Sequence, residues 1–409
     1  SVIGRDSTFK FLGLNKFKHK AEYEFAYLLA ARKNTDQPIA TNSKDFTNYN
    51  YGGIVYSKSA LVFDYLMNYL GKEKFDEAMQ FYFEQWKFKH PTPQDFKNSI
   101  EQTTGKNIDA LYAQLKNTQP PTATKKSIKP ALFLNLNETN KYQYISFLPT
   151  ASYNMYDGLR LGAAIHNYQL PLPKLQFFVN PSIGLGSNKF NFFGRGSLNK
   201  YTKKYWLQAH FGAQHYTYDN FTSDAGKQYQ LSVTRFSPGL KITFYNDDIK
   251  SKARTQVGLK MIYLKEQNLN FNIINTPAGP VDVITTPTTI SYVNRLYFDK
   301  WDDRVLYPYH LNFTVDQSTD FVRAAFTAKQ YFNYASNKGG IEARFFAGKF
   351  FYLGTKTFIK QFETDRYHLN LSGPKGYEDY TYSDYFVGRS EFEGWQSQQI
   401  MERDGFFKV

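Results

Sequence analysis

The sequence predicts a multidomain α + β protein, with a helical N-terminal region followed by an antiparallel β-barrel that crosses a membrane. Apolar residues recur at helical spacing up to residue 117, and at every second position beyond residue 130. The strands of the second part run to about ten residues or more. That length is close to the ~9–11 residues of a tilted membrane strand, and it exceeds the ~5–6 of ordinary sheets.

Composition limits the possible chemistry. The 409 residues are 18% aromatic and carry a net charge of +14, without a single cysteine. Disulfides, thiolate zinc sites and cysteine nucleophiles are therefore excluded. No apolar run approaches the ~18 residues of a membrane helix, although barrel strands would not show in such a search because only alternate residues face lipid.

The first predicted domain, residues 1–117, contains helices that apolar spacing and capping residues define. Thr92 is a typical N-cap, Pro93 fits the first helical position, and Asp95 places a carboxylate at the positive end of the helix dipole. The predicted helices are His19–Asn34, Tyr56–Leu70, Lys72–Lys89, Pro93 to Gly105, and Asn107–Asn117.

A linker and a β region follow. Residues 118–129 are rich in Pro, Thr and Lys and cannot carry a packed face. Residues 130–409 are predicted to form the barrel, with about a dozen strands, a long Pro- and Asn-rich connection at Asn268–Thr288, and a polar stretch at Gln361–Arg403. The final residues resemble a turn that opens another strand, so the barrel is expected to be incomplete at the C-terminus.

The β region alternates between an apolar and a mixed polar face. In 253–261, for example, Val257, Leu259 and Met261 alternate with Gln256, Gly258 and Lys260. Tyrosines cluster at strand ends, as in the interfacial girdles of membrane proteins. The alternative is a soluble β-sandwich or propeller, which the strand length and the lack of a short repeat disfavour.

The sequence contains no motif for a metal or a nucleotide. None of the seven histidines is followed by Glu, so the HExxH zinc motif is missing, and His210 and His215 lie at an odd separation that places them on opposite faces of a strand. Lys and Arg are dispersed rather than clustered. This distribution favours attraction to anionic lipid headgroups over binding of nucleic acid.

Three blocks in the helical part resemble the membrane alanyl aminopeptidase family of zinc peptidases, the gluzincins. Residues 55–60, Val-Tyr-Ser-Lys-Ser-Ala, are similar to the family's V-Y-x-K-G/T-A motif, with Ser59 in place of Gly or Thr. Residues 82–96 resemble its "Yf-x-x-wkf-k-HPtp-x-Df" block, and 105–108 its "tGknl" block. The β region is similar to that of bacterial members fused to an outer-membrane barrel.

The resemblance implies that Tyr56 is catalytic. In the family, the matching hydroxyl stabilises the oxyanion that forms when zinc-bound water attacks the scissile carbonyl of a peptide substrate. The alternative is that Tyr56 is an aromatic residue packed in the core. The family's zinc ligands do not occur in these residues, so the chain is expected to be a fragment that is inactive alone, with zinc bound by the full-length protein.

Two main hypotheses for the function follow from these observations. In the first, the chain is the C-terminal portion of an outer-membrane-anchored zinc metallopeptidase of a Gram-negative-type cell. Its helical part would then be the C-terminal end of the gluzincin domain, in the periplasm, and its barrel would contact outer-membrane lipid. In the alternative, the protein is a non-enzymatic outer-membrane pore or assembly and secretion factor that carries a degenerate peptidase module. A soluble β-rich binding protein is a third, weaker option.

Overall fold

The computed structural model describes residues 19–114, most of 126–354, and short segments near the C-terminus. The gaps within the second range are at 136–137, 140, 155, 278 and 337, and the C-terminal segments are 381, 384–386, 401–403 and 406–408. The predicted linker, 118–129, lies outside these residues up to 125, and the first strand begins within its last three residues. The polar stretch Gln361–Arg403 falls largely outside them, whereas residues 406–408 of the strand expected after the final turn are described.

All described helices belong to the N-terminal part of the chain. The helices predicted from apolar spacing are confirmed, with ends that shift by a few residues, and the Thr92 cap forms as expected. Their bounds are α1 (His19–Arg32), η4 (Ser43–Asp45), α2 (Asn48–Asn50), η5 (Tyr51–Lys58), α3 (Ser59–Leu70), α4 (Lys72–Trp86), α5 (Pro93–Thr104) and α6 (Asp109–Gln114). No helix of the described part combines the length and apolarity that crossing a membrane requires.

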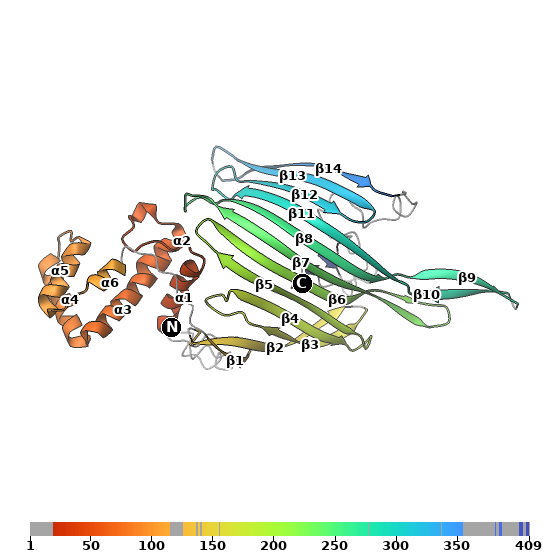
Figure 1. The fold of residues 1–409 in the computed structure, drawn as a ribbon, viewed down its shortest axis with the longest axis horizontal. Coiled ribbons are helices and arrows are strands. Elements are labelled where there is room, and N and C mark those ends of the chain that lie inside the picture. Colours follow the sequence, from red (N-terminus) through yellow and green to blue (C-terminus); the bar gives the residue numbers. More distant parts are fainter. Residues whose placement is uncertain are drawn as a thin grey trace.

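The β region is dominated by one large sheet of twelve strands (Figure 1). Its strands, in order across the sheet, are β1 (Ser127–Leu132), β2 (Tyr142–Asn154), β3 (Gly158–His166), β4 (Leu175–Gly184), β5 (Phe190–Tyr201), β6 (Tyr205–Thr222), β7 (Gln228–Tyr245), β8 (Ala253–Gln267), β11 (Thr288–Asp302), β12 (Tyr309–Gln317), β13 (Phe321–Asn333) and β14 (Gly340–Tyr352). The short strands β15 (Asp384–Phe386), β16 (Met401–Arg403) and β17 (Phe406–Lys408) form a separate sheet.

The predicted fold class is wrong in its main feature, because this sheet is open. A closed barrel requires hydrogen bonds between its first and last strands. In the described residues, β1 and β14 are instead the two edges, and β1 pairs with β2 in parallel, so the sheet is mixed rather than antiparallel. The molecule is predominantly β, with a short N-terminal helical region. Alternation along a strand specifies its two faces, but it does not specify whether the end strands meet.

The long connection predicted at Asn268–Thr288 is also corrected. It forms a hairpin of β9 (Asn270–Thr276) and β10 (Gly279–Thr285), paired in antiparallel register. The hairpin extends from the end of the sheet opposite the helices (Figure 1). Its prolines lie outside the ladder or at the first residues of β10, where a missing amide hydrogen is tolerated.

One face of the sheet is apolar and exposed. Residues that are register partners across eight neighbouring strands are all aliphatic, and the five leucines among them are 51–57% exposed. The row runs Leu175, Leu198, Ala209, Leu240, Leu259, Leu296, Val315 and Ala324. The alternation predicted for 253–261 is therefore confirmed, and its apolar side is the exposed one.

The opposite face is polar near the helices and apolar further away. The row adjacent to the leucines consists of Gln176, Ser197, His210, Gly239, Lys260, Arg295, Asp316 and Arg323. Asp316 is fully buried and accepts from Arg295 at 2.6 and 2.9 Å and from Arg323 at 3.3 Å. Beyond this row, a buried cluster that includes Tyr216, Ile262 and Leu264 forms the core of the sheet.

The helical region lies against loops at one end of the sheet (Figure 1). Arg32 donates to the carbonyl oxygen of Leu172 at 3.0 Å, and Asn34 donates to that of Tyr201 at 2.8 Å. On the other side, the Lys250 ammonium group donates to the carbonyl oxygen of Lys44 at 2.7 Å. The loops before β4 and β8 and the end of β5 thus contact the last turn of α1 and the segment that follows it.

Candidate functional site

The segment that carries Tyr56 is a π-helix, η5, between α2 and α3. Thr47 begins this helical stretch, since its hydroxyl accepts from the amide of Asn50 at 3.0 Å and its carbonyl from the amide of Tyr51 at 2.8 Å. π-Helical turns are rare and are found frequently at functional sites. The V-Y-x-K motif therefore lies in a backbone conformation that is rare in proteins.

Close packing against α1 fixes η5 in place. Gly53 faces the carbonyl oxygen of Ala26, and a Cβ atom there would lie only 3.3 Å from that oxygen. The Tyr49 hydroxyl donates to the same carbonyl oxygen at 3.0 Å. Ile54, beside Gly53, is fully buried. Glycine at position 53 allows the backbones of the two helices to approach closely, whereas a larger residue would have to push them slightly apart.

Tyr56 is 62% exposed, so the alternative of a core aromatic does not hold. Its ring contacts Tyr51 edge-to-face, with centroids 6.2 Å apart, and Tyr51 makes a similar contact with Phe46 at 6.2 Å. These contacts hold the ring on one side and leave the phenol open to solvent. Tyr56 can therefore donate its hydroxyl to a group that approaches from outside the helical region.

Lys58, two residues further on, is a buried ammonium group that lies over the ring of Tyr27, 5.3 Å from its centroid. Burial lowers the pKa of Lys58, and the negative charge of Asp36 opposes that shift. Burial also raises the pKa of Asp36 against the attraction of Lys58, and raises that of Tyr27 to about 12. In Lys58 and Asp36 desolvation outweighs their mutual attraction, whereas in Tyr27 the charge of Asp36 raises the pKa further.

A network of side-chain amides orders the loop between α1 and η5. The Gln37 carbonyl oxygen accepts from the Thr47 amide and from the Asn50 side chain, both at 3.0 Å. Gln37 in turn donates to the carbonyl oxygen of Asp45 at 2.9 Å, and Asn50 donates to that of Thr35 at 2.6 Å. Asn50 and Gln37 are buried, so this network fixes the start of η5.

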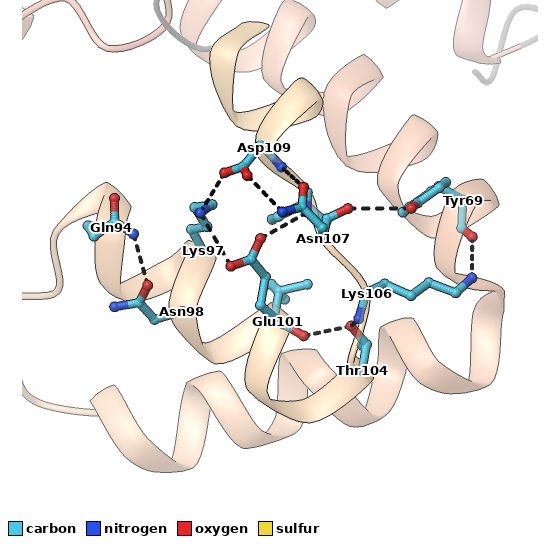
Figure 2. A network of polar contacts seen from close by, with 11 residues as sticks. Tyr69, Gln94, Lys97, Asn98, Glu101, Thr104, Lys106, Asn107 and Asp109 are labelled. Atoms are coloured by element: carbon cyan, nitrogen blue, oxygen red, sulfur yellow. Dashed lines mark hydrogen bonds and ion pairs between the residues drawn. The ribbon is translucent and has the colours of Figure 1, made fainter.

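The "tGknl" block has a structural role in the last turn of the helical region (Figure 2). The Glu101 carboxylate accepts from the Ile108 amide at 2.9 Å, and Asn107 accepts from the Asp109 amide at 2.8 Å, so both cap the start of α6. Lys97 bridges Asp109 at 2.6 Å and Glu101 at 3.3 Å. These contacts lock α5 onto α6, far along the chain from Tyr56.

Ser59, the departure from the family motif, is accommodated at the junction of η5 and α3. Its hydroxyl donates to the carbonyl oxygen of Ile54 at 3.4 Å. The hydroxyl of a serine within a helix can donate to a backbone carbonyl of the preceding turn in this way. Ser59 is therefore compatible with the backbone conformation of η5.

The described residues do not provide a zinc site. No group of three or more His, Asp or Glu side chains in them could hold a metal ion. A catalytic zinc requires three protein ligands that converge on one point. The donor set of the described residues thus does not fit zinc.

Several residues of the site were missed by sequence reasoning. Asp36, Gln37 and Asn50 carry no motif, and their role depends on a loop that folds back onto η5. The one available signal was Lys58, a charged residue within an apolar helical stretch. Such a residue points to a buried partner, but it does not identify Asp36, which lies 22 positions earlier.

Comparison with known protein families gives a match in the helical region. Residues 13–115 match the model of the Peptidase family M1 domain. The match covers α1 to α6, including η5, and supports a peptidase of the gluzincin type in this region. No curated protein and no solved structure matches the chain.

Proposed function

We propose that the helical region is the C-terminal end of the catalytic domain of an M1-type zinc aminopeptidase, and that Tyr56 stabilises the oxyanion of the peptide-hydrolysis transition state. The observation that carries this proposal is the exposed phenol of Tyr56 on a π-helix inside the matched region. An enzyme of this family acts on peptide substrates.

The chemistry of Tyr56 follows from its position. A phenol hydroxyl donates a hydrogen bond to negative charge, and the charge on the carbonyl oxygen develops only as the tetrahedral intermediate forms. The interaction is therefore stronger in the transition state than in the bound substrate, so it raises kcat more than it lowers KM. The rings of Tyr51 and Phe46 orient Tyr56 before the substrate binds.

Zinc would be held by residues outside these 409, and it would supply the activated water of the reaction when bound. In the proposal, the full-length protein carries an HExxH segment upstream of Ser1, and its catalytic domain is completed by the helical region described here. The sequence of the gene upstream of Ser1 tests this directly. If no HExxH lies within about one hundred residues upstream, roughly one domain length, the protein would lack the zinc ligands that the proposal requires, and the proposal would fail.

The main test is the substitution Tyr56→Phe in the full-length protein. Removing one oxyanion donor is expected to lower kcat by about 10²–10³ with little change in KM. Steady-state kinetics on an aminoacyl amide substrate measure both constants. Tyr65→Phe is the matched control, because Tyr65 is also 62% exposed and lies on the adjacent helix α3. Equal activity of the wild type and Tyr56→Phe would remove Tyr56 from the mechanism.

The location of the protein in the outer membrane, with the helical region in the periplasm, remains part of the proposal. The exposed aliphatic row across the sheet supports it, because water disfavours an apolar surface of this extent. Acyl chains would cover this face. Backbone groups along β1 and β14 must also be paired in hydrocarbon, so the proposal requires both edges to be covered in the membrane.

Membrane extraction tests this location. The protein is expected to stay in the membrane pellet in high salt and at alkaline pH, and to be released by detergent. Release by high salt alone would mean that the protein is held only by surface charge, and it would favour a soluble β-rich protein instead.

A further inference from the structure

A large cavity lies between the segment that follows α1 and the polar face of the sheet. Its volume is about 1,940 Å³, larger than the roughly 300–1,000 Å³ of sites for small ligands. One wall is formed by residues 29–38 and 46–50 of the helical region, and the other by polar-face residues of β4–β8, β11 and β12. The cavity therefore has room for a segment of a polymer, and Tyr56 does not line it.

The wall is strongly basic. Among the described residues that line the cavity, nine are Lys or Arg and three are Asp. Arg195, Lys241 and Lys260 come from the polar face, Arg254 comes from the start of β8, and Lys203 comes from the loop between β5 and β6. Such an excess of one sign in a concave, partly desolvated space attracts a ligand of the opposite charge.

Aromatic rings hold some of these cations in position. The Lys241 ammonium group lies over the ring of Trp206, 5.2 Å from its centroid, and the Arg254 guanidinium group lies over Tyr245 at 5.2 Å. Arg195 donates to the Tyr168 hydroxyl at 3.1 Å. In these contacts, neutral side chains orient the three cations. The rings also offer flat apolar surfaces to a ligand.

The wall also contains side-chain oxygen atoms that lack a hydrogen-bond donor in the part of the chain that the structure describes. Asp36 Oδ2 and Asn50 Oδ1 are buried and have no hydrogen-bond partner among the described residues, and both side chains line the cavity. A fully ionised inorganic anion such as sulfate has no hydrogen to donate to these atoms, whereas the amide groups of a peptide can donate to them. The ligand that fits the wall thus combines negative charges with N–H donors.

We infer that this cavity binds an acidic peptide segment, whose carboxylates lie against Arg195 and Lys241 and whose backbone amides face Asn50. The inference rests on the proposed peptidase function in one respect only: the helical region that forms one wall acts on peptides. The cavity would then select or retain acidic peptides at a distance from Tyr56.

The experiment measures binding rather than turnover. The purified full chain in detergent is titrated into two dye-labelled peptides, (Glu-Gly)₃ and (Lys-Gly)₃, and fluorescence anisotropy gives the two dissociation constants. We expect (Glu-Gly)₃ to bind at least about tenfold more tightly. Its affinity should fall as salt is raised, because ions screen charges in an open cavity.

A matched pair of variants locates the binding. Lys241→Gln removes a cation that lies over a ring inside the cavity. Lys227→Gln removes one that lies over the ring of Tyr229, at 4.9 Å, in the exposed turn between β6 and β7. The first is expected to weaken binding several-fold and Arg195→Gln/Lys241→Gln about tenfold, whereas the second should bind as the wild type does.

Three outcomes would overturn the inference. These are equal affinity for the two peptides, equal loss in Lys241→Gln and Lys227→Gln, or displacement of (Glu-Gly)₃ by dextran sulfate but not by excess unlabelled (Glu-Gly)₃. The competition assay uses only the wild type, so the inference stays testable if a variant misfolds. Tyr56→Phe should bind (Glu-Gly)₃ normally. Failure of the peptidase proposal would thus appear in kcat, and failure of the cavity proposal in affinity.

Discussion

The helical region and the sheet use the same kinds of side chain in opposite ways. In the helical region, Leu66, Leu70 and Ile100 are buried together between α3, α4 and α5, and the charged side chains of α4 are exposed. In the sheet, a row of leucines faces outwards, and the buried side chains include Asp316 and Arg323. Both regions are amphipathic, and their apolar residues repeat with the period of the helix or of the strand.

The difference shows that amphipathicity fixes which residues share a face, but not which face is exposed. Helices α3–α5 bury their apolar stripes against each other because water surrounds them. The sheet shields its polar face by bringing the helical loops over it, and it leaves its aliphatic face open. The surroundings that each region requires are therefore different, which is the physical basis for the proposed location at a membrane.

The largest expected effect tests the core of the helical region. Leu66→Ala removes a side chain that is 1% exposed and leaves a cavity, so it should lower the free energy of unfolding by about 2–5 kcal/mol. Leu259→Ala is the matched change on the sheet, where the side chain is 54% exposed, and it should cost less than about 0.5 kcal/mol in detergent. Denaturation followed by far-UV circular dichroism measures both.

The comparison would fail if the two alanine variants were equally destabilised. That result would mean that the leucine face of the sheet is packed against protein in the folded molecule, and it would remove the support for lipid contact. A loss confined to Leu66→Ala would instead sharpen the contrast between an inward-facing and an outward-facing apolar surface.

A smaller effect is expected at the cap of α5. Thr92 accepts from the Asp95 amide at 3.3 Å and donates to the Asp95 carboxylate at 2.6 Å, while its own amide donates to that carboxylate at 2.8 Å. Thr92→Ala should cost about 1 kcal/mol of helix stability. Gln94→Ala is the control in the same turn, since Gln94 bonds only to the Asn98 side chain among the contacts described here.

The cap also predicts a pH dependence. The hydrogen bonds from the Thr92 hydroxyl and amide lower the pKa of Asp95 below its usual value. The carboxylate therefore contributes stability above its unfolded pKa, near 3.9, and the contribution is lost as pH falls through the lower folded pKa. The difference in the free energy of unfolding between the wild type and Thr92→Ala should therefore become smaller as the pH falls. A constant difference from pH 7 down to about pH 2 would contradict this assignment.

Much of the helical region could be predicted from the sequence because its determinants are local. Thr92, Pro93 and Gly105 bracket α5, and each acts within a few residues of itself. The predicted helix at Tyr56 was placed correctly but missed the π-helical turn. In that turn Gly53 lies against the carbonyl oxygen of Ala26, a contact across 27 positions of chain that local spacing does not reveal.

Local sequence likewise predicts one part of the candidate site, and only the fold reveals the rest. Tyr56 was found through its neighbours in sequence, whereas Asp36 and Asn50 reach Lys58 and Gln37 only through a folded loop. The basic cavity was not predicted at all, since its residues come from both regions and look dispersed along the chain. Charges that are far apart in sequence meet when alternate residues of adjacent strands share one face.

The sequence by itself determined the division into a helical and a β region, the two faces of each strand, and the motif around Tyr56. These properties follow from local spacing, because side chains repeat with the helix or strand period. Only the tertiary structure decided that the sheet is open, that β1 is parallel to β2, and that polar residues gather opposite the helical loops. Those features depend on which distant backbones pair, and no local interaction fixes that choice.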